Sequence, residues 1–334
     1  MKKLSAFARS SLGRASAAIL GFGCLALLVY HSDPRSVWDA VTHAPLMFPL
    51  VVLLQALVVG FESWALLLLY GPLRRGIPAR EIWRSSMFSF AVVVVFPFGR
   101  AVGEAARAAM LSRYVGSARA AAAAAQIQAV TLLGNAIISV PCLIAAWLLV
   151  GTGWLFWAVL GHFAISALLA SAMIVAGRHA GFVAKLGRFF PGGAAWGSKV
   201  DQHLRNEQQN IGRPLFFIVL SRVVDTLQRM VLLVAVGGTF GIVEGFGSQG
   251  INLVASSAGD AIPGQVGVIE MGYSLAAEVL NLSRGNAIAM GVLFHLAVLL
   301  WVGLGFLAAL IMSPAQPVEA SPETLLAHPE RHSP

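Results

Sequence analysis

The chain has 334 residues, of which 57% are hydrophobic and only 11% are charged, and its formal net charge is +8. Soluble globular domains carry roughly 25% charged residues, so this composition excludes a water-soluble protein and indicates one embedded in a bilayer. The basic residues are spread over connections between apolar segments, where they report membrane orientation. No nucleic-acid partner is therefore expected.

Six apolar segments follow one another along the chain, and most reach the roughly 20 residues that a helix needs to cross a hydrocarbon core. They are 15–30, 45–70, 121–150, 154–176, 214–236 and 286–311. The first could be a signal peptide, but no small-residue cleavage site follows Tyr30, which favours an uncleaved helix. Two further apolar segments, 85–98 and 248–262, are too short to cross the bilayer as ordinary helices.

The distribution of basic residues predicts the orientation of the chain. Of its 23 Lys and Arg residues, 19 lie in five segments, and only two, Arg35 and Arg284, lie in the other connections. The five segments are 1–14, 71–84, 98–120, 177–213 and the tail 312–334. The positive-inside rule places all five, and so both termini, in the cytoplasm. Residues 1–311 are then a single membrane domain with 177–213 as a cytoplasmic loop, and the Pro-rich tail is predicted to be disordered.

The short apolar segment 85–98 lies between two basic segments, so it must enter and leave the bilayer on the cytoplasmic side. Because proline breaks a helix, the turn is expected at Pro97 in a re-entrant hairpin that spans about 85–115. The second short segment repeats the pattern from the outer face, as a hairpin over about 248–281 with its break at Pro263.

The two hairpins share a sequence theme, in which proline is followed by glycines and then by Glu. These residues are Pro97, Gly99, Gly103 and Glu104 in the first hairpin and Pro263, Gly264, Gly267 and Glu270 in the second. A spanning helix flanks each hairpin on either side, and the two units start on opposite faces. The sequence therefore predicts an all-α fold of six spanning helices and two re-entrant hairpins in an inverted repeat, whose broken helices form a substrate site near the midplane. The alternative is eight spanning helices, two of them kinked by proline.

Ionisable side chains inside the apolar segments are the candidate site residues, because each is costly there unless it is paired or hydrated. Arg222, Asp225 and Arg229 fall on one helical face, where Asp225 can pair with either arginine. The two arginines suit a lipid phosphate, and a self-neutralised structural pair is the alternative. The predicted cavity residues are Arg100, Gly103, Glu104, Arg107, Arg222, Asp225, Glu270 and Glu62.

Partners can be suggested for some of these residues. Glu62 could pair with Arg100, Arg107 or Arg222, and Glu104 and Arg107 lie at positions i and i+3 of one helix. Glu270 has only Arg284 nearby in the sequence, so its partner must come from elsewhere. The polar residues of the apolar helices are expected to make interhelical hydrogen bonds or to be satisfied core histidines. They are Gln126, Gln128, Asn135, His162 and His295.

The segment from Pro97 to Leu111, with its Gly103-Glu104-x-x-Arg107 core, resembles the first signature of the lysylphosphatidylglycerol synthase transmembrane-region family, whose members are also called flippase-like. The segment from Ile262 to Glu270 resembles the second signature. The resemblance covers roughly 15–311 in helix order and favours the stand-alone branch associated with hopanoid biosynthesis. It implies a lipid-handling core in a bacterial cytoplasmic (inner) membrane. In similar proteins the last helix often carries basic residues, whereas this chain has His295 there.

Three function classes follow. The first is a lipid translocase for a polar or anionic lipid, linked to hopanoid or aminoacyl-phospholipid handling. The second is a membrane enzyme that acts on a lipid head group, with Glu104 and Glu270 as its acid and base. The third is a scaffold for lipid-biosynthetic enzymes. The sequence has no HExxH, P-loop or GxSxG motif, so no catalytic residue, metal or cofactor is expected, and membrane lipids are the expected partners.

Overall fold

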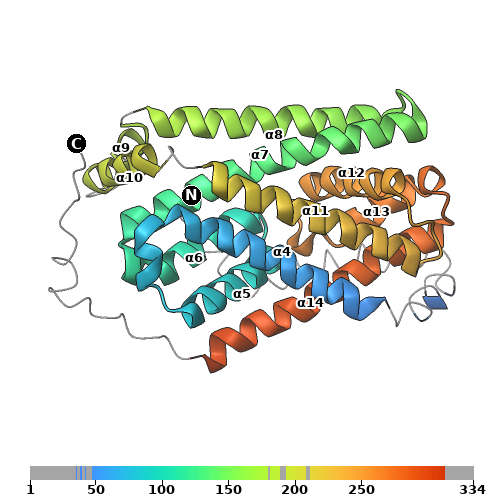
Figure 1. Ribbon diagram of the computed structural model, residues 1–334, viewed down its shortest axis with the longest axis horizontal. Helices are drawn as coiled ribbons and strands as arrows, with labels where there is room; N and C mark the ends of the chain where they lie inside the picture. The colour runs from blue at the N-terminus through green and yellow to red at the C-terminus, as the bar shows by residue number, and fades with distance from the viewer. Residues whose placement is uncertain are drawn as a thin grey trace, which may run out of the picture.

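The computed structural model describes residues 35, 38–39, 42, 47–179, 181–188, 193–207 and 211–312. The predicted first spanning segment, 15–30, and the predicted disordered tail beyond residue 312 lie outside these residues. Within the described ranges the chain folds into helices and connections and contains no strand (Figure 1). The predicted all-α class is thereby confirmed.

Four helices are long and apolar enough to cross a membrane, which makes this an integral membrane protein. They are α4 (Phe48–Leu69), α7 (Ser117–Val150), α8 (Trp154–Arg178) and α14 (Arg284–Ile311), and they match four of the six predicted spanning segments. A fifth predicted segment is α11 (Gly212–Ala235), which has 24 residues but carries three charged side chains in its middle. The full count of six spanning helices stays a prediction.

Helix α7 is longer than a single crossing of the bilayer requires. Its 34 residues correspond to about 51 Å at 1.5 Å per residue, against a hydrocarbon core of about 30 Å. Two short helices, α9 (Phe182–Gly187) and α10 (Gly193–Glu207), pack beside its N-terminal end (Figure 1). The side chain of Asp201 accepts hydrogen bonds of 3.0 Å from the first backbone N–H groups of α9 and so fixes α9 on α10. Both helices belong to the predicted cytoplasmic loop.

The first predicted hairpin consists of α5 (Ala79–Val95) and α6 (Gly99–Val115), which pack against each other. The turn between them falls at Pro97, as predicted, and Phe98 adopts a left-handed conformation with φ of 52°. Gly103 brings the two helices close together, because a Cβ atom at this position would lie 2.5 Å from Val93 Cγ2. The first arm begins at residue 79 rather than 85, since its first turns carry charged side chains outside the apolar run.

The second hairpin is less regular. Its first arm is α12 (Ile242–Ala258), and after the turn the chain forms η3 (Pro263–Gln265), the eight-residue α13 (Val268–Leu275) and η4 (Glu278–Leu280). The return arm of the predicted hairpin is therefore three short helical pieces rather than one helix. Gly264 and Gly267 have φ of 63° and 83°, in the left-handed region, which interrupts the helix on both sides of Val266.

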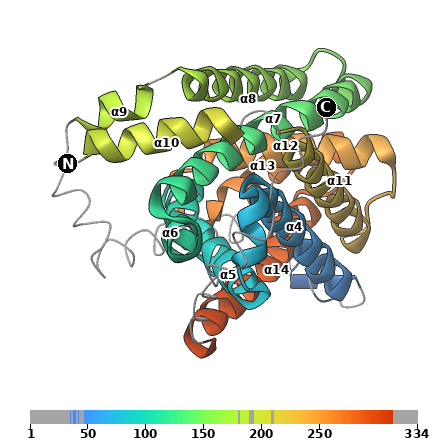
Figure 2. The same cartoon turned by 60° about the vertical axis from the view of Figure 1, so that its left-hand side comes forward.

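The two units contact each other reciprocally. The first helices of the units, α4 and α11, pack together; the first hairpin packs on α14 through α5, and the second packs on α7 through α12 (Figures 1 and 2). The hairpin tips also meet, because the Phe98 N–H donates to the Asp260 carbonyl at 2.8 Å. These contacts fit the predicted inverted repeat, which stays a prediction. The membrane face from which each hairpin enters stays a prediction.

Candidate functional site

A polar layer crosses the middle of three helices, between two apolar cores. On α11, Ile218 belongs to one core and Leu232 to the other, and the charged residues lie between them. On α4, Leu66 and Val51 likewise enclose the polar stretch. The corresponding core residues of α7 are Ile127 and Ile138. The polar residues of the layer are Gln55, Glu62 and Ser63 on α4, Thr131 and Asn135 on α7, and Arg222, Asp225 and Arg229 on α11.

This layer surrounds a cavity of about 260 Å³, whose other walls are the two hairpins, α8 and α14. The wall contains four arginines and four carboxylates, so its formal charge is balanced. They are Arg100, Arg107, Arg222 and Arg229 together with Glu62, Glu104, Asp225 and Asp260. Non-helical backbone at membrane depth needs such a polar or hydrated surrounding, so the cavity fits the prediction of re-entrant hairpin tips.

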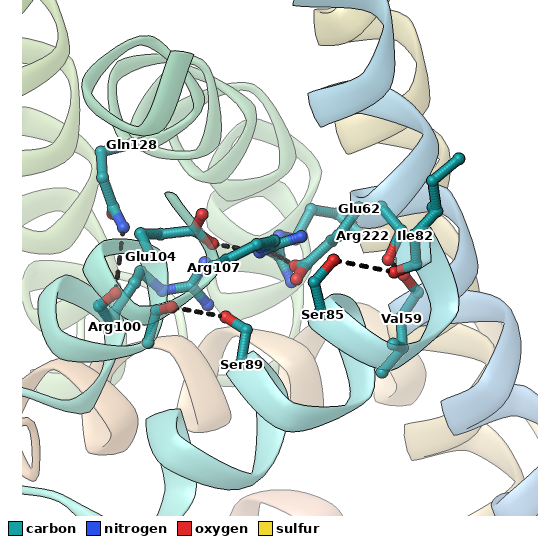
Figure 3. A network of polar contacts seen from close by, with 12 residues as sticks. Val59, Glu62, Ile82, Ser85, Ser89, Arg100, Glu104, Arg107, Gln128 and Arg222 are labelled. Carbon is teal, nitrogen blue, oxygen red and sulfur yellow. Dashed lines mark hydrogen bonds and ion pairs between the residues drawn. The ribbon is translucent and has the colours of Figure 1, made fainter. Parts of the chain in front are cut away.

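Three ion pairs hold most of these charges. Glu104 bonds to Arg107 within α6, and Arg222 Nη2 bonds to Glu62 Oε1 at 2.5 Å, which joins α11 to α4 (Figure 3). Arg229 Nη2 bonds to Asp225 Oδ1 at 3.0 Å, one turn away on α11. The predicted pairs within one helix, Glu104 with Arg107 and Asp225 with an arginine, are therefore present. Of the three arginines predicted as partners of Glu62, Arg222 forms the ion pair. Arg100 and Arg107 also lie within electrostatic range of Glu62.

Several donors in the wall remain available to a ligand. The side chain of Arg100 is exposed and forms no ion pair within the described part of the chain. Arg107 Nε, Arg222 Nε and two nitrogens of Arg229 are buried without a hydrogen-bond partner among the described residues. Arg229 lies only 3.8 Å from the centre of the Phe294 ring. Buried donors of this kind favour a ligand that brings its own acceptor atoms.

The helix starts that follow the two prolines differ. Gly99, at the start of α6, is packed against the Val93 carbonyl and lies on the cavity wall beside Arg100. At the second hairpin, the Gly267 N–H ahead of α13 donates to Glu270 Oε2 at 2.8 Å. The protein's own carboxylate thus occupies this helix start, and only the first one faces the cavity.

The structure brings eight of the thirteen predicted site and helix-break residues to the cavity wall. These are Arg100, Glu104, Arg107, Arg222, Asp225, Glu62, Gly99 and Gly264. The remaining five, Gly103, Glu270, Pro97, Pro263 and Gly267, do not line it. Glu270 is fully buried behind His295, to which it bonds at 2.6 Å, so it does not face Glu104 across the cavity as an acid–base pair would require.

Sequence reasoning left several wall residues out of the predicted site. Arg229 had a usable signal, since it lies four residues after Asp225. No spacing in the sequence pointed to Asn252, Asp260 or His162 as wall residues, because their place on the wall depends on how α12 and α8 pack. His162, expected to be a satisfied core histidine, contacts hydroxyls of Ser257 at 3.1 Å and Ser166 at 3.4 Å and also lies on the wall.

The interhelical hydrogen bonds expected of the amide side chains are present for two of them. Gln126 donates to the Leu204 carbonyl of α10 at 3.2 Å. Gln128 donates to the Arg100 carbonyl of α6 at 3.3 Å, in the first turn of that helix (Figure 3). The first hairpin is therefore tied to α7 beside the cavity.

Comparison with family models identifies the family to which the chain belongs. The model described as the lysylphosphatidylglycerol synthase TM region matches residues 15–305. The chain belongs to this family. The match covers both hairpins and all the cavity residues named above, so a lipid-related role in the membrane applies to the part of the chain that contains the site. The hopanoid-associated branch stays a prediction. No similar protein was found among curated proteins, and no similar structure among the solved ones.

Proposed function

We propose that this protein is a lipid translocase, which moves a lipid with an anionic head group between the leaflets of a bacterial cytoplasmic membrane. The observation that carries this proposal is the charge-balanced cavity between the two hairpin tips, in the middle of apolar helices. A lipid that crosses a bilayer must bring its head group through hydrocarbon, where an ion is strongly disfavoured. Fixed polar groups in the cavity replace the water that the head group loses.

The arginines are the proposed contacts of the phosphate, because the guanidinium group presents several donors in one plane. Arg100 makes the first contact, since it forms no ion pair among the described residues. Arg107 and Arg222 follow by exchanging part of their bonds to Glu104 and Glu62 for bonds to the phosphate. The N-terminal end of α6 adds a partial positive charge beside Arg100.

The enzyme and scaffold alternatives make different demands. An enzyme with Glu104 and Glu270 as acid and base needs both carboxyl groups at one reacting bond, and the burial of Glu270 behind His295 removes support for this pair. A scaffold needs no polar cavity at all. The translocase therefore accounts for more of the observed arrangement than either alternative does.

The test is leaflet exchange in liposomes that contain the purified protein and fluorescently labelled phosphatidylglycerol. A membrane-impermeant quencher reports how fast labelled lipid reaches the outer leaflet. The parent protein should speed the exchange without altering the lipid. Arg100→Gln should slow it about tenfold or more, because a hydrogen bond to a charged group contributes about 1.5–3 kcal/mol. Arg107→Ala should slow it as well.

The matched control is Arg75→Gln, which removes an exposed arginine of η1 (Gly71–Gly76) outside the cavity and should leave the rate unchanged. Recovery of a chemically modified lipid would support the enzyme instead. If the parent protein produces no exchange above empty liposomes, with other lipids tried as substrates, the translocase proposal is wrong and the scaffold remains.

A further inference from the structure

The second hairpin contains a buried acid–base pair that the proposed lipid contacts do not use. Glu270 on α13 is fully buried, and its Oε1 lies 2.6 Å from His295 Nδ1 on α14. The other ring nitrogen, Nε2, lies 2.8 Å from the Gly264 carbonyl at the hairpin tip. Gly291, one turn before His295, makes this possible, because a Cβ atom there would lie 2.8 Å from Glu270 Cγ.

These contacts fix how many protons the pair holds. A carbonyl oxygen only accepts, so Nε2 must carry a hydrogen to bond with Gly264. The short contact between Nδ1 and Oε1 then needs one further proton, either on the imidazole or on the carboxyl group. Without it, the lone pair of Nδ1 would face the carboxylate at 2.6 Å, and the contact would be repulsive. The pair thus has a built place for one exchangeable proton.

We propose that Glu270 and His295 form the binding site for a proton that is transported together with the lipid. His295 lies on the cavity wall, whereas Glu270 is sealed behind it, so the proton enters and leaves through the imidazole. When the proton leaves, the pair separates and His295 releases the Gly264 carbonyl. No other group changes its charge in this step, and the proton itself is the only species gained or lost.

The position of the pair connects it to both hairpin tips and to the lipid contacts. The Gly264 carbonyl belongs to the turn of the second hairpin, which packs against Val94 at the end of α5. The residue before His295 is Phe294, whose ring lies under Arg229. A movement of α14 at His295 therefore shifts the hairpin tip and the charged wall together.

The charged and titratable groups around Glu270 and His295 do not compete with this pair for the proton. Arg229 and Asp225 of α11 neutralise each other, and Tyr273 of α13 is an uncharged phenol within electrostatic range of both and of Glu270. Asp260 in the tip is exposed and accepts from Gln265 at 3.3 Å. Helix α5 faces α14 here with the apolar side chains of Phe90 and Val94.

Coupling to the lipid rests on the proposed function, and liposomes with an imposed pH difference test it. The same labelled phosphatidylglycerol is used, and the membrane potential is clamped to zero with potassium and valinomycin. One proton per lipid should drive a steady asymmetry between the leaflets of about tenfold for each pH unit, since one unit is a tenfold ratio of proton activity. An equal distribution despite the gradient, with exchange still fast, would overturn the proton site and leave the translocase standing.

Two variants locate the proton. Glu270→Gln keeps an acceptor for Gly267 and a donor for His295 but holds no exchangeable proton, and His295→Gln removes the other half of the pair. Both should exchange lipid yet lose the asymmetry. His162→Gln removes another buried histidine, whose ring contacts the hydroxyls of Ser166 and Ser257, and should keep the asymmetry whatever its exchange rate. If the two variants of the pair also keep it, the proton binds elsewhere and the assignment is wrong.

A second measurement separates this inference from the proposed function. In detergent, the ring nitrogens of ¹⁵N-labelled His295, assigned by their loss in His295→Gln, should change their chemical shifts with pH. Glu270→Gln should alter that response. Ring signals that stay constant over the whole range in which the protein is folded would overturn the proton site, even if no lipid exchange is observed.

Discussion

The two hairpins carry the same succession of proline, glycine and glutamate, yet they use the glutamate differently. In the first hairpin, Glu104 bonds to Arg107 on its own helix and lies on the cavity wall. In the second, Glu270 bonds to the start of its own helix and to His295 on α14, and it is sealed off from the cavity. The same motif therefore places one glutamate where a ligand in the cavity can contact it and the other where a ligand cannot.

The difference follows from the partners that each helix offers. Helix α6 is 17 residues long and places a basic side chain one turn after Glu104. Helix α13 has only eight residues and no basic side chain, so Glu270 must find a partner on another helix. A short helix packed tightly against α14 buries its carboxylate, whereas a long helix at the cavity edge keeps its ion pair within reach of the cavity.

The comparison of the two hairpins assumes that they enter the membrane from opposite faces. Cysteine labelling tests this assumption, because each cysteine either reacts from a given side or does not. In a chain without Cys24 and Cys142, cysteines at Ser112, near the end of α6, and at Ser198, on α10, should react only from the cytoplasmic side. Labelling of either from outside would favour eight spanning helices, because a single crossing at 85–98 would place both outside.

Among substitutions, Glu270→Ala should have the largest effect on stability. It leaves His295 and the Gly267 N–H buried without their partner, and breaking a buried pair costs about 3–5 kcal/mol. Denaturant titration in detergent, followed by tryptophan fluorescence, measures the loss. A change below that of Glu104→Ala would mean that Glu270 is hydrated, and the contrast between the hairpins would disappear.

Glu104→Gln should have a smaller effect, about 1.5–3 kcal/mol, because its ion pair faces a polar cavity that can hydrate Arg107. The same titration applies. Adding Arg107→Gln should restore part of the loss, since the double variant leaves no unpaired charge in the wall. Additive losses would show that the two side chains do not interact in the folded protein in detergent.

Replacing a glycine by alanine in either hairpin should lower the free energy of unfolding by a similar amount, about 1–3 kcal/mol, but for different reasons. Gly103→Ala places a methyl group against Val93 and the Ser89 carbonyl of the facing helix. Gly267→Ala forces an alanine to adopt a φ of 83°. Adding Val93→Ala should therefore recover part of the loss in Gly103→Ala and none in Gly267→Ala. Equal recovery in both would contradict the separate causes.

The sequence by itself determined the helical membrane class, four of the spanning segments, the two proline breaks and the pairs formed within one helix. These features depend on composition, on apolar runs and on spacings of three or four residues, such as Glu104 with Arg107 and Asp225 with Arg229. All of them are local, so no knowledge of packing was needed.

Only the tertiary structure decided which charges meet across helices and which glutamate faces the cavity. Arg222 pairs with Glu62, 160 residues away, and His295 with Glu270, 25 residues away. The sequence offered three partners for Glu62 and, for Glu270, only a partner from elsewhere in the chain, because the choice depends on how closely helices approach. Small residues such as Gly291 set that approach, and the sequence shows no more than that a small residue is present.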